Sequence, residues 1–129
     1  VLARLELPEP KILEDIELPL EKLSTKKGTS AVYQLRFPKI GRYELVFRMS
    51  SALGELAQLP ISVFLNNTLQ QTVTLNGTEG QILERVVTLP IRQDGEKYMK
   101  LYFGESGIDM HRMFLRYAGQ NDIESFRNE

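Results

Sequence analysis

Two stretches in the first half of the chain alternate apolar and polar residues one by one. The apolar positions are Ala31, Tyr33, Leu35 and Phe37 in SAVYQLRF, and Tyr43, Leu45, Phe47 and Met49 in GRYELVFRMS. A period of two is that of a β-strand with one buried face. Both stretches are therefore predicted to be strands. Pro38 and Gly41 between them favour a turn, so we expect the two strands to form a hairpin.

A second pair of strand-like stretches, LPISVFL and TLQQTVTL, flanks two asparagines at 66–67. A two-residue loop would place Ile61 opposite Thr72, whereas a three-residue loop would place Ile61 opposite Val73. Residues opposite each other share a face, so the second register gives one continuous apolar surface and is preferred. Asparagine tolerates the left-handed backbone that such a loop requires.

The rest of the chain contains further strand-like stretches separated by turn signals. Strands are predicted at 3–7, near 16–23, at 82–89, 97–103 and 107–117, with a longer loop or single helical turn at 50–58. Asp94-Gly95 is a strong hairpin signal, and Pro19 argues against a helix in LEDIELPLEKL. The sequence thus predicts an all-β fold, a β-sandwich jelly roll with eight to nine antiparallel strands in two sheets.

Composition narrows the classes of function. The 129 residues suit one domain, and the absence of cysteine excludes disulfides and thiolate metal sites. The net charge of −1 comes from mixed charges without a basic stripe, so no nucleic-acid partner is expected. No apolar run approaches the roughly 20 residues of a membrane helix. With no leader at its start, we interpret the chain as a piece of a longer protein, with a module at 1–117 and a polar tail or linker stub at 118–129.

No constellation of residues predicts catalysis. The single histidine, His111, would share a strand face with Asp109, and Ser106 is near in sequence. A serine–histidine–aspartate triad needs three convergent groups, which strand neighbours two residues apart rarely provide. We therefore interpret His111 as a solvated strand residue and expect the isolated domain not to be an enzyme.

Two tyrosines are the best candidates for an exposed ring surface. Tyr98 and Tyr102 lie on the less apolar face of KYMKLYF, with Lys100 between them, whereas Tyr33 and Tyr43 lie on apolar faces and are predicted to be core. An aromatic ring can stack on the C–H side of a sugar while polar groups nearby bind the hydroxyls. Tyr98 and Tyr102 are therefore candidate ligand-binding residues.

The order of these motifs resembles that of carbohydrate-binding modules of the family 6/35/36 type, within the galactose-binding-like group of jelly rolls. The resemblance covers residues 30–116 and rests on Gly41-Arg42-Tyr43, the Asn66-Asn67 tip, the loop NGTEGQ and Gly95-Glu96-Lys97-Tyr98. It implies a non-catalytic accessory module of a larger secreted glycoside hydrolase or related glycan-processing protein. The expected location is extracellular, periplasmic or on the cell surface. A purely structural or adhesion domain without a small-molecule ligand is the alternative.

The resemblance also implies where a ligand would bind. The loops at 50–58 and 76–81 should meet at one end of the sandwich, which would gather Glu55, Gln58, Glu79 and Gln81 as the polar part of a site for an oligosaccharide or polysaccharide. Gln81 and Ile82 stand where the family often has an aromatic residue, so this loop has the scaffold without the ring. Glu6 and Asp109 resemble carboxylates that hold a structural Ca²⁺ in such modules. A catalytic domain in the same chain is the expected partner.

Overall fold

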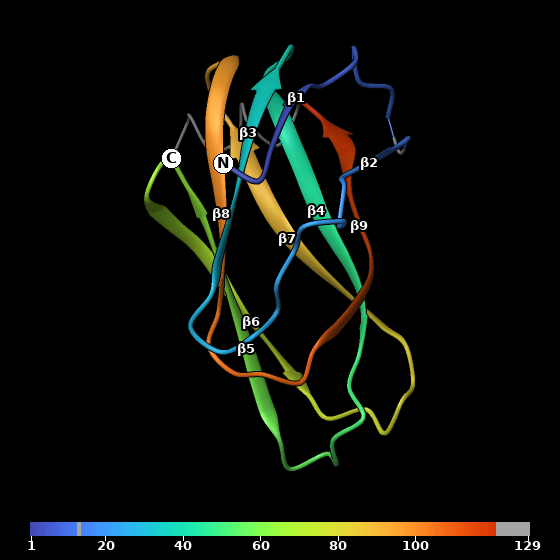
Figure 1. The fold of residues 1–129 in the computed structure, drawn as a ribbon. Coiled ribbons are helices and arrows are strands. Elements are labelled where there is room, and N and C mark those ends of the chain that lie inside the picture. Colours follow the sequence, from blue (N-terminus) through green and yellow to red (C-terminus); the bar gives the residue numbers. More distant parts are fainter. Residues whose placement is uncertain (13, 121–129) are drawn as a thin grey trace.

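The computed structural model describes residues 1–12 and 14–120, and within these residues every regular element is a strand (Figure 1). The strands are β1 (Ala3–Glu6), β2 (Asp15–Glu17), β3 (Ser30–Phe37), β4 (Gly41–Ser50), β5 (Gln58–Leu65), β6 (Thr68–Asn76), β7 (Leu83–Ile91), β8 (Gly95–Phe103) and β9 (Asp109–Gly119). They form a five-stranded sheet in the order β1-β3-β8-β5-β6 and a four-stranded sheet in the order β2-β9-β4-β7. The predicted all-β sandwich with two sheets is confirmed. One pair departs from the expected antiparallel arrangement, since β1 runs parallel to β3.

Two of the predicted hairpins are wrong. The strands β3 and β4 belong to different sheets, and so do β7 and β8. Each of these strands has an apolar face directed at the same core, and the short connection between two such strands crosses from one sheet to the other. The first crossing is held by the hydroxyl of Tyr43, which donates to the carbonyl of Lys39 at 2.9 Å, and by that of Tyr117, which donates to the carbonyl of Ile40 at 2.9 Å. Turn residues in the sequence mark where a chain reverses, but they do not say whether the next strand pairs or crosses.

The hairpin of β5 and β6 combines the two registers considered for it. Its tip is the two-residue turn Asn66-Asn67, with φ angles of 49° and 65°, and Leu65 pairs with Thr68. An irregularity then shifts the register, so that Ile61 pairs with Val73 as predicted. A β-bulge of this kind adds a residue to one strand and changes which side chains share a face. The apolar face therefore sets the register along most of the hairpin. The turn itself has two residues and is one residue shorter than the predicted loop.

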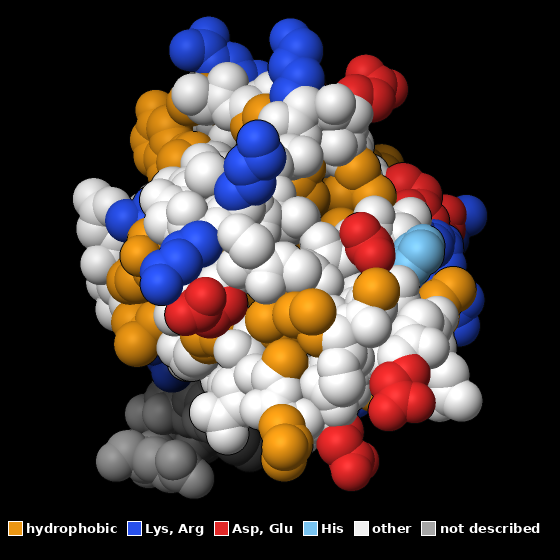
Figure 2. Space-filling view, turned by 60° about the horizontal axis from the view of Figure 1, so that its bottom comes forward, with side chains coloured by type: hydrophobic (Ala, Val, Ile, Leu, Met, Phe, Trp, Pro, Cys, Tyr) orange, Lys and Arg blue, Asp and Glu red, His pale blue; other side chains and the backbone are white. Residues whose placement is uncertain are grey.

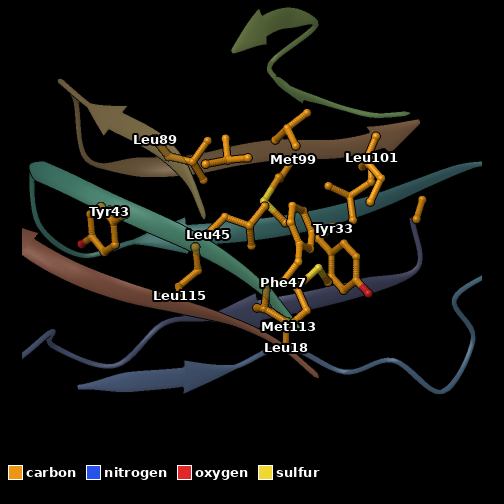
Figure 3. Packing of buried hydrophobic residues seen from close by; sticks show 14 of the residues in the cluster. Leu18, Tyr33, Tyr43, Leu45, Phe47, Leu89, Met99, Leu101, Met113 and Leu115 are labelled. Carbon is orange, nitrogen blue, oxygen red and sulfur yellow. The ribbon is translucent and has the colours of Figure 1, made fainter. Parts of the chain in front are cut away.

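The core lies between the two sheets and contains the predicted apolar faces (Figure 3). Tyr33, Tyr43 and Phe47 are fully buried, which confirms their assignment to the core. The hydroxyl of Tyr33 donates to the carbonyl of Pro19 at 2.6 Å, which ties the segment after β2 to the five-stranded sheet. Burial raises the pKa of Tyr33 to about 12, because the charged form is poorly solvated there.

Part of the outer face of the four-stranded sheet is covered by the chain's own charged side chains. Phe114 of β9 points to this outer side, yet it is only 1% exposed. The guanidinium carbons of Arg112 and Arg116 lie 4.1 and 5.3 Å from the centre of its ring. Asp15 of β2 forms ion pairs with both arginines, at 3.1 and 3.3 Å. Val46 of β4, which pairs with Phe114, is fully buried beside it.

The last strand extends slightly beyond the expected end of the module. Residues 118 and 119 still belong to β9, whereas residues 121–129 of the predicted tail lie outside the described residues. The described part of the chain contains no helix with the length and hydropathy needed to span a membrane.

Candidate functional site

The loop NGTEGQ packs tightly against the loop between β4 and β5. The backbone N–H groups of Glu79 and Gly80 donate to the carbonyls of Leu53 and Ser51, at 3.1 and 2.8 Å. The hydroxyl of Thr78 donates to the carbonyl of Ser51 at 3.0 Å and accepts from its N–H at 2.8 Å. The expected meeting of the two loops is therefore seen in the structure (Figure 1).

Glycine is required in this loop because two backbones come into close contact. A Cβ atom on Gly77 would lie 1.9 Å from the carbonyl oxygen of Gly54, so no other residue fits without moving the neighbouring loop. Glu79 and Gly80 have φ angles of 52° and 90°, which belong to the left-handed region that glycine adopts readily. The two glycines thus serve loop-to-loop packing and a tight reversal of the chain.

Three of the four polar residues predicted at this end come together. Glu55, Glu79 and Gln81 line one open hollow of about 370 Å³, with Gly77, Thr78 and Leu83. Gln58 is not among its lining residues. No aromatic residue lines the hollow either. This agrees with the sequence, which has Gln81 and Ile82 where the resemblance led us to look for an aromatic residue. Figure 2, which turns this end toward the viewer, shows acidic side chains beside separate hydrophobic ones.

The second candidate surface is the outer face of the five-stranded sheet. Tyr98 and Tyr102 of β8 point to this side and are 46% and 41% exposed, which agrees with the sequence-based expectation. Four residue steps along the strand separate them, or roughly 14 Å at 3.4 Å per step. Because β8 is the middle strand of this sheet, both rings lie on the broad part of the face and not at its edge.

Tyr98 borders a hollow on this surface. This hollow, named here the Tyr98 groove, has a volume of about 540 Å³ and is lined by Val1, Val32, Asn66, Asn67, Tyr98 and Lys100. One wall is the tip of the β5–β6 hairpin, which is fixed to β8 by two hydrogen bonds. The N–H of Asn66 donates to the carbonyl of Tyr98 at 2.8 Å, and the Oδ1 atom of Asn66 accepts from the N–H of Tyr98 at 2.9 Å.

The groove presents groups of three kinds. The Tyr98 ring supplies an apolar face with a hydroxyl at its edge, Asn67 supplies an exposed amide, and Lys100 supplies an ammonium group whose nitrogen lies 4.5 Å from the centre of the Phe64 ring. Sequence reasoning identified Tyr98 but treated Asn66 and Asn67 only as turn residues. The spacing of the turn did not show that the tip bends toward the middle strand, since β5 and β8 are distant in sequence and become neighbours only in the fold.

The two carboxylates considered for calcium lie at opposite ends of the sandwich. Glu6 pairs with Arg36, next to the end of β3, and its carboxylate lies 3.7 Å from the guanidinium of that arginine. Asp109 pairs with Ser50, the last residue of β4. One cation could not contact both. No group of three or more His, Cys, Asp or Glu residues within 1–12 and 14–120 is placed to hold a metal ion.

The single histidine makes a contact that the sequence did not predict. Nε2 of His111 lies 2.6 Å from the hydroxyl of Ser50, a buried residue at the end of β4. Ser106, which is near His111 in sequence, instead accepts a hydrogen bond from the N–H of Lys27 at 2.8 Å. The three groups weighed as a triad therefore do not converge.

Comparison with known proteins identifies the fold. No protein-family model matches the chain. A β-glucosidase of Ruminococcus albus is 26% identical over 79% of this chain and 11% of its own length. A β-glucosidase from Paenibacillus barengoltzii shares the fold over 89% of this chain and 13% of its own, with 16% identity and a TM-score of 0.56. The chain thus spans only about a tenth of the length of either enzyme.

Shorter solved structures match over most of their length. A family 35 carbohydrate-binding module from Clostridium thermocellum has a TM-score of 0.60 and 15% identity, over 81% of this chain and 85% of the module. Modules of families 36 and 6 share the fold as well, with TM-scores of 0.55 and 0.54. The fold is therefore the jelly roll of carbohydrate-binding modules of families 6, 35 and 36, as the resemblance in the sequence implied.

Proposed function

We propose that this chain is a non-catalytic carbohydrate-binding module that belongs to a longer glycoside hydrolase or related glycan-processing protein. The proposal is supported by the shared fold and by the two long β-glucosidases in which a similar segment makes up about a tenth of the chain. Such a module would keep its parent enzyme close to a polysaccharide, outside the cytoplasm. A catalytic domain in the same polypeptide would be its partner.

The exposed ring of Tyr98 at the side of a groove is the observation that carries this proposal. A sugar stacked on the ring would bury its C–H face, and its hydroxyls would reach the amide of Asn67 and the ammonium of Lys100. Tyr102 extends the same face along β8, so a chain of several sugars could contact both rings. The hollow at the loop end has carboxylates without a ring and is the weaker candidate.

The hairpin wall of the groove suits uncharged sugar hydroxyls, whereas Lys100 adds one positive charge to the groove lining. Residues 56–78, which include the whole hairpin of β5 and β6, contain no Asp, Glu, Lys, Arg or His. The hairpin wall of the groove therefore offers amides and hydroxyls, which can donate and accept hydrogen bonds with uncharged sugar hydroxyls without an ionic partner.

Calorimetric titration with soluble cello-, xylo- and manno-oligosaccharides tests the proposal. Tyr98→Ala should weaken binding about tenfold, or about 1.4 kcal/mol, because the stacking surface is lost. The control pair Glu79→Gln and Gln81→Ala, at the loop end, should bind as the unchanged protein does. If no oligosaccharide binds at about 1 mM, the domain is structural or adhesive. If only the loop-end variants lose binding, the site is at that end.

Two further arms of the same experiment address catalysis and calcium. The isolated domain should release no product from chromogenic glycosides, although Glu55 and Glu79 both line the hollow at the loop end. Product that Glu79→Gln abolishes would contradict the non-catalytic function. A structural Ca²⁺ stays a prediction from the resemblance. If the ion is bound, a chelator should lower the melting temperature of the purified protein. Unchanged melting would count against a bound calcium ion.

A further inference from the structure

The four free edges of the two sheets differ sharply in charge and length. The edges β1 and β2 have four and three residues and carry charged side chains, Arg4 and Glu6 in the first and Asp15 and Glu17 in the second. The edge β7 has nine residues and contains two charges and a proline, Glu84, Arg85 and Pro90. The edge β6 also has nine residues, TLQQTVTLN, without a charged residue or a proline.

The edge strand β6 lacks the usual protection against pairing. A free edge offers a row of backbone N–H and C=O groups, and natural proteins block it with charges, prolines, bulges or short strands. The irregularity in β6 lies near its start, between the pairs of Val63 and Phe64, and leaves the stretch 71–76 regularly paired to β5. No described segment pairs with the other side of β6. Gln71, Thr72 and Thr74 are exposed along it.

We propose that β6 pairs with β6 of a second copy of this chain, antiparallel and around a two-fold axis. The second copy is favoured over another partner because the strand is complementary to itself. Because β6 contains no charged residue, antiparallel pairing of two such strands sets no like charges opposite each other in any register, and its exposed threonines and glutamine can form hydrogen bonds. The same two-fold pairing of β7 would bring together identical charged side chains and a proline, which has no backbone N–H to donate.

The geometry of this pairing has a consequence for binding. A two-fold axis that makes two strands antiparallel within one sheet is perpendicular to that sheet, so it leaves the outer faces of both copies on the same side. The two five-stranded sheets would become one continuous sheet with two Tyr98 grooves on one surface. Two linked sites on one polysaccharide bind more tightly than either alone. This consequence rests on the proposed function, whereas the dimer itself does not.

Sedimentation equilibrium of the whole 129-residue chain tests the dimer without any carbohydrate. A contact made by one pair of strands is small for a specific interface, so we expect a weak dimer that forms as the concentration rises toward about 1 mM. Thr74→Lys, which places a charge on the free edge, should be monomeric throughout. Gln93→Lys adds the same charge in the exposed turn after β7 and should dimerise like the unchanged protein.

Each outcome of this experiment either supports or overturns the proposed dimer. A chain that stays monomeric at about 1 mM overturns the proposal whatever the variants do, and so does a Thr74→Lys variant that dimerises fully. Gln71→Lys serves as the second edge variant if Thr74→Lys fails to fold, as judged by its circular dichroism. Retention on insoluble polysaccharide then separates the two proposals, because loss of the dimer should reduce retention several-fold while the affinity for a short oligosaccharide stays unchanged.

Discussion

The two outer faces of the sandwich treat aromatic rings in opposite ways. On the four-stranded sheet, Phe114 lies under two arginines that are paired with carboxylates of β2. On the five-stranded sheet, Tyr98 and Tyr102 are both exposed, and Tyr98 lines the Tyr98 groove. Aromatic and basic residues alternate on one strand of each face, as RMFLR in β9 and YMKLY in β8, so the local pattern is similar. The difference is that a carboxylate of β2 holds the two arginines of β9 over Phe114, whereas the nitrogen of Lys100 lies over the ring of Phe64 and both tyrosines stay exposed.

This difference separates a ring that stabilises the fold from a ring available to a ligand. The covering of Phe114 excludes water from an apolar strip that includes Val46, and it fixes β2 on β9 through ion pairs. Nothing described covers the tyrosines, so their burial would have to come from a bound molecule. Four changes test this separation.

The largest effect on stability is expected from the covered ring. Phe114→Ala should lower the free energy of unfolding by about 3–5 kcal/mol, because it leaves a cavity between Val46 and the arginines. Urea unfolding measures the change, and Phe114→Leu, which keeps most of the volume, should cost clearly less. A loss below about 1 kcal/mol for Phe114→Ala would mean that the covering contributes little.

The second-largest effect on stability is expected at Tyr33, on the inward side of the five-stranded sheet. Tyr33 faces inward from this sheet, and burial raises its pKa from 10.0 to about 12. The folded state therefore keeps a proton that the unfolded state loses, so the stability from Tyr33 is complete below pH 10 and is lost as the pH rises from 10 toward 12. Urea unfolding between pH 9 and about 11.5 should show this fall, with a smaller fall for Tyr33→Phe. If the free energy of unfolding of the unchanged protein and of Tyr33→Phe fell equally with pH, the burial of the hydroxyl would be contradicted.

A smaller effect should come from the ion pairs over Phe114. Asp15→Asn removes a partner that Arg112 and Arg116 share, while Arg112 keeps its ion pair with Glu17, and should cost about 1 kcal/mol at low salt, since the groups are partly exposed. Glu96→Gln, which weakens the pair with Arg36 on the open face, should cost less than half of that. In about 1 M salt, screening should make the two substitutions cost similar amounts of unfolding free energy. A cost for Asp15→Asn that does not depend on salt would point to packing instead of charge.

The smallest effect is expected for the open rings. Tyr102→Ala should change the free energy of unfolding by no more than about 0.5 kcal/mol, because the side chain is 41% exposed on the outer face. Thermal and urea unfolding of this variant beside Phe114→Ala give the contrast directly. A cost of about 2 kcal/mol or more would show that the five-stranded face is also part of the fold's stability and is less available to a ligand.

Most of the fold could be predicted from the sequence because half-buried strands carry a period of two. The strands β3, β4 and β8 were found within two residues of their observed ends, and the inward tyrosines were assigned correctly. The connections at 38–40 and 92–94 could not be predicted in the same way. A turn signal is local, whereas the choice between pairing and crossing depends on which distant strands complete each sheet.

The candidate site was predicted in part for a similar reason. Alternation showed that Tyr98 faces away from the core, but the wall formed by Asn66 and Asn67 depends on β5 lying next to β8. The burial of Val46 and Phe114 was also missed. Both residues break the simple rule that every second residue of a strand is buried. Long arginine side chains lie over the ring of Phe114, and Val46 pairs with Phe114. Contacts between strands remote in sequence account for each omission.

An NMR titration of the ¹⁵N-labelled protein with the oligosaccharide that binds most tightly tests the central claim most directly. Backbone amides of the Tyr98 groove, above all those of Asn67, Tyr98 and Lys100, should shift in proportion to saturation, while amides around Phe114 and in the loop NGTEGQ stay in place. Shifts confined to the four-stranded face or the loop end, with the groove unchanged, would contradict the assignment of the open tyrosine face as the carbohydrate-binding surface.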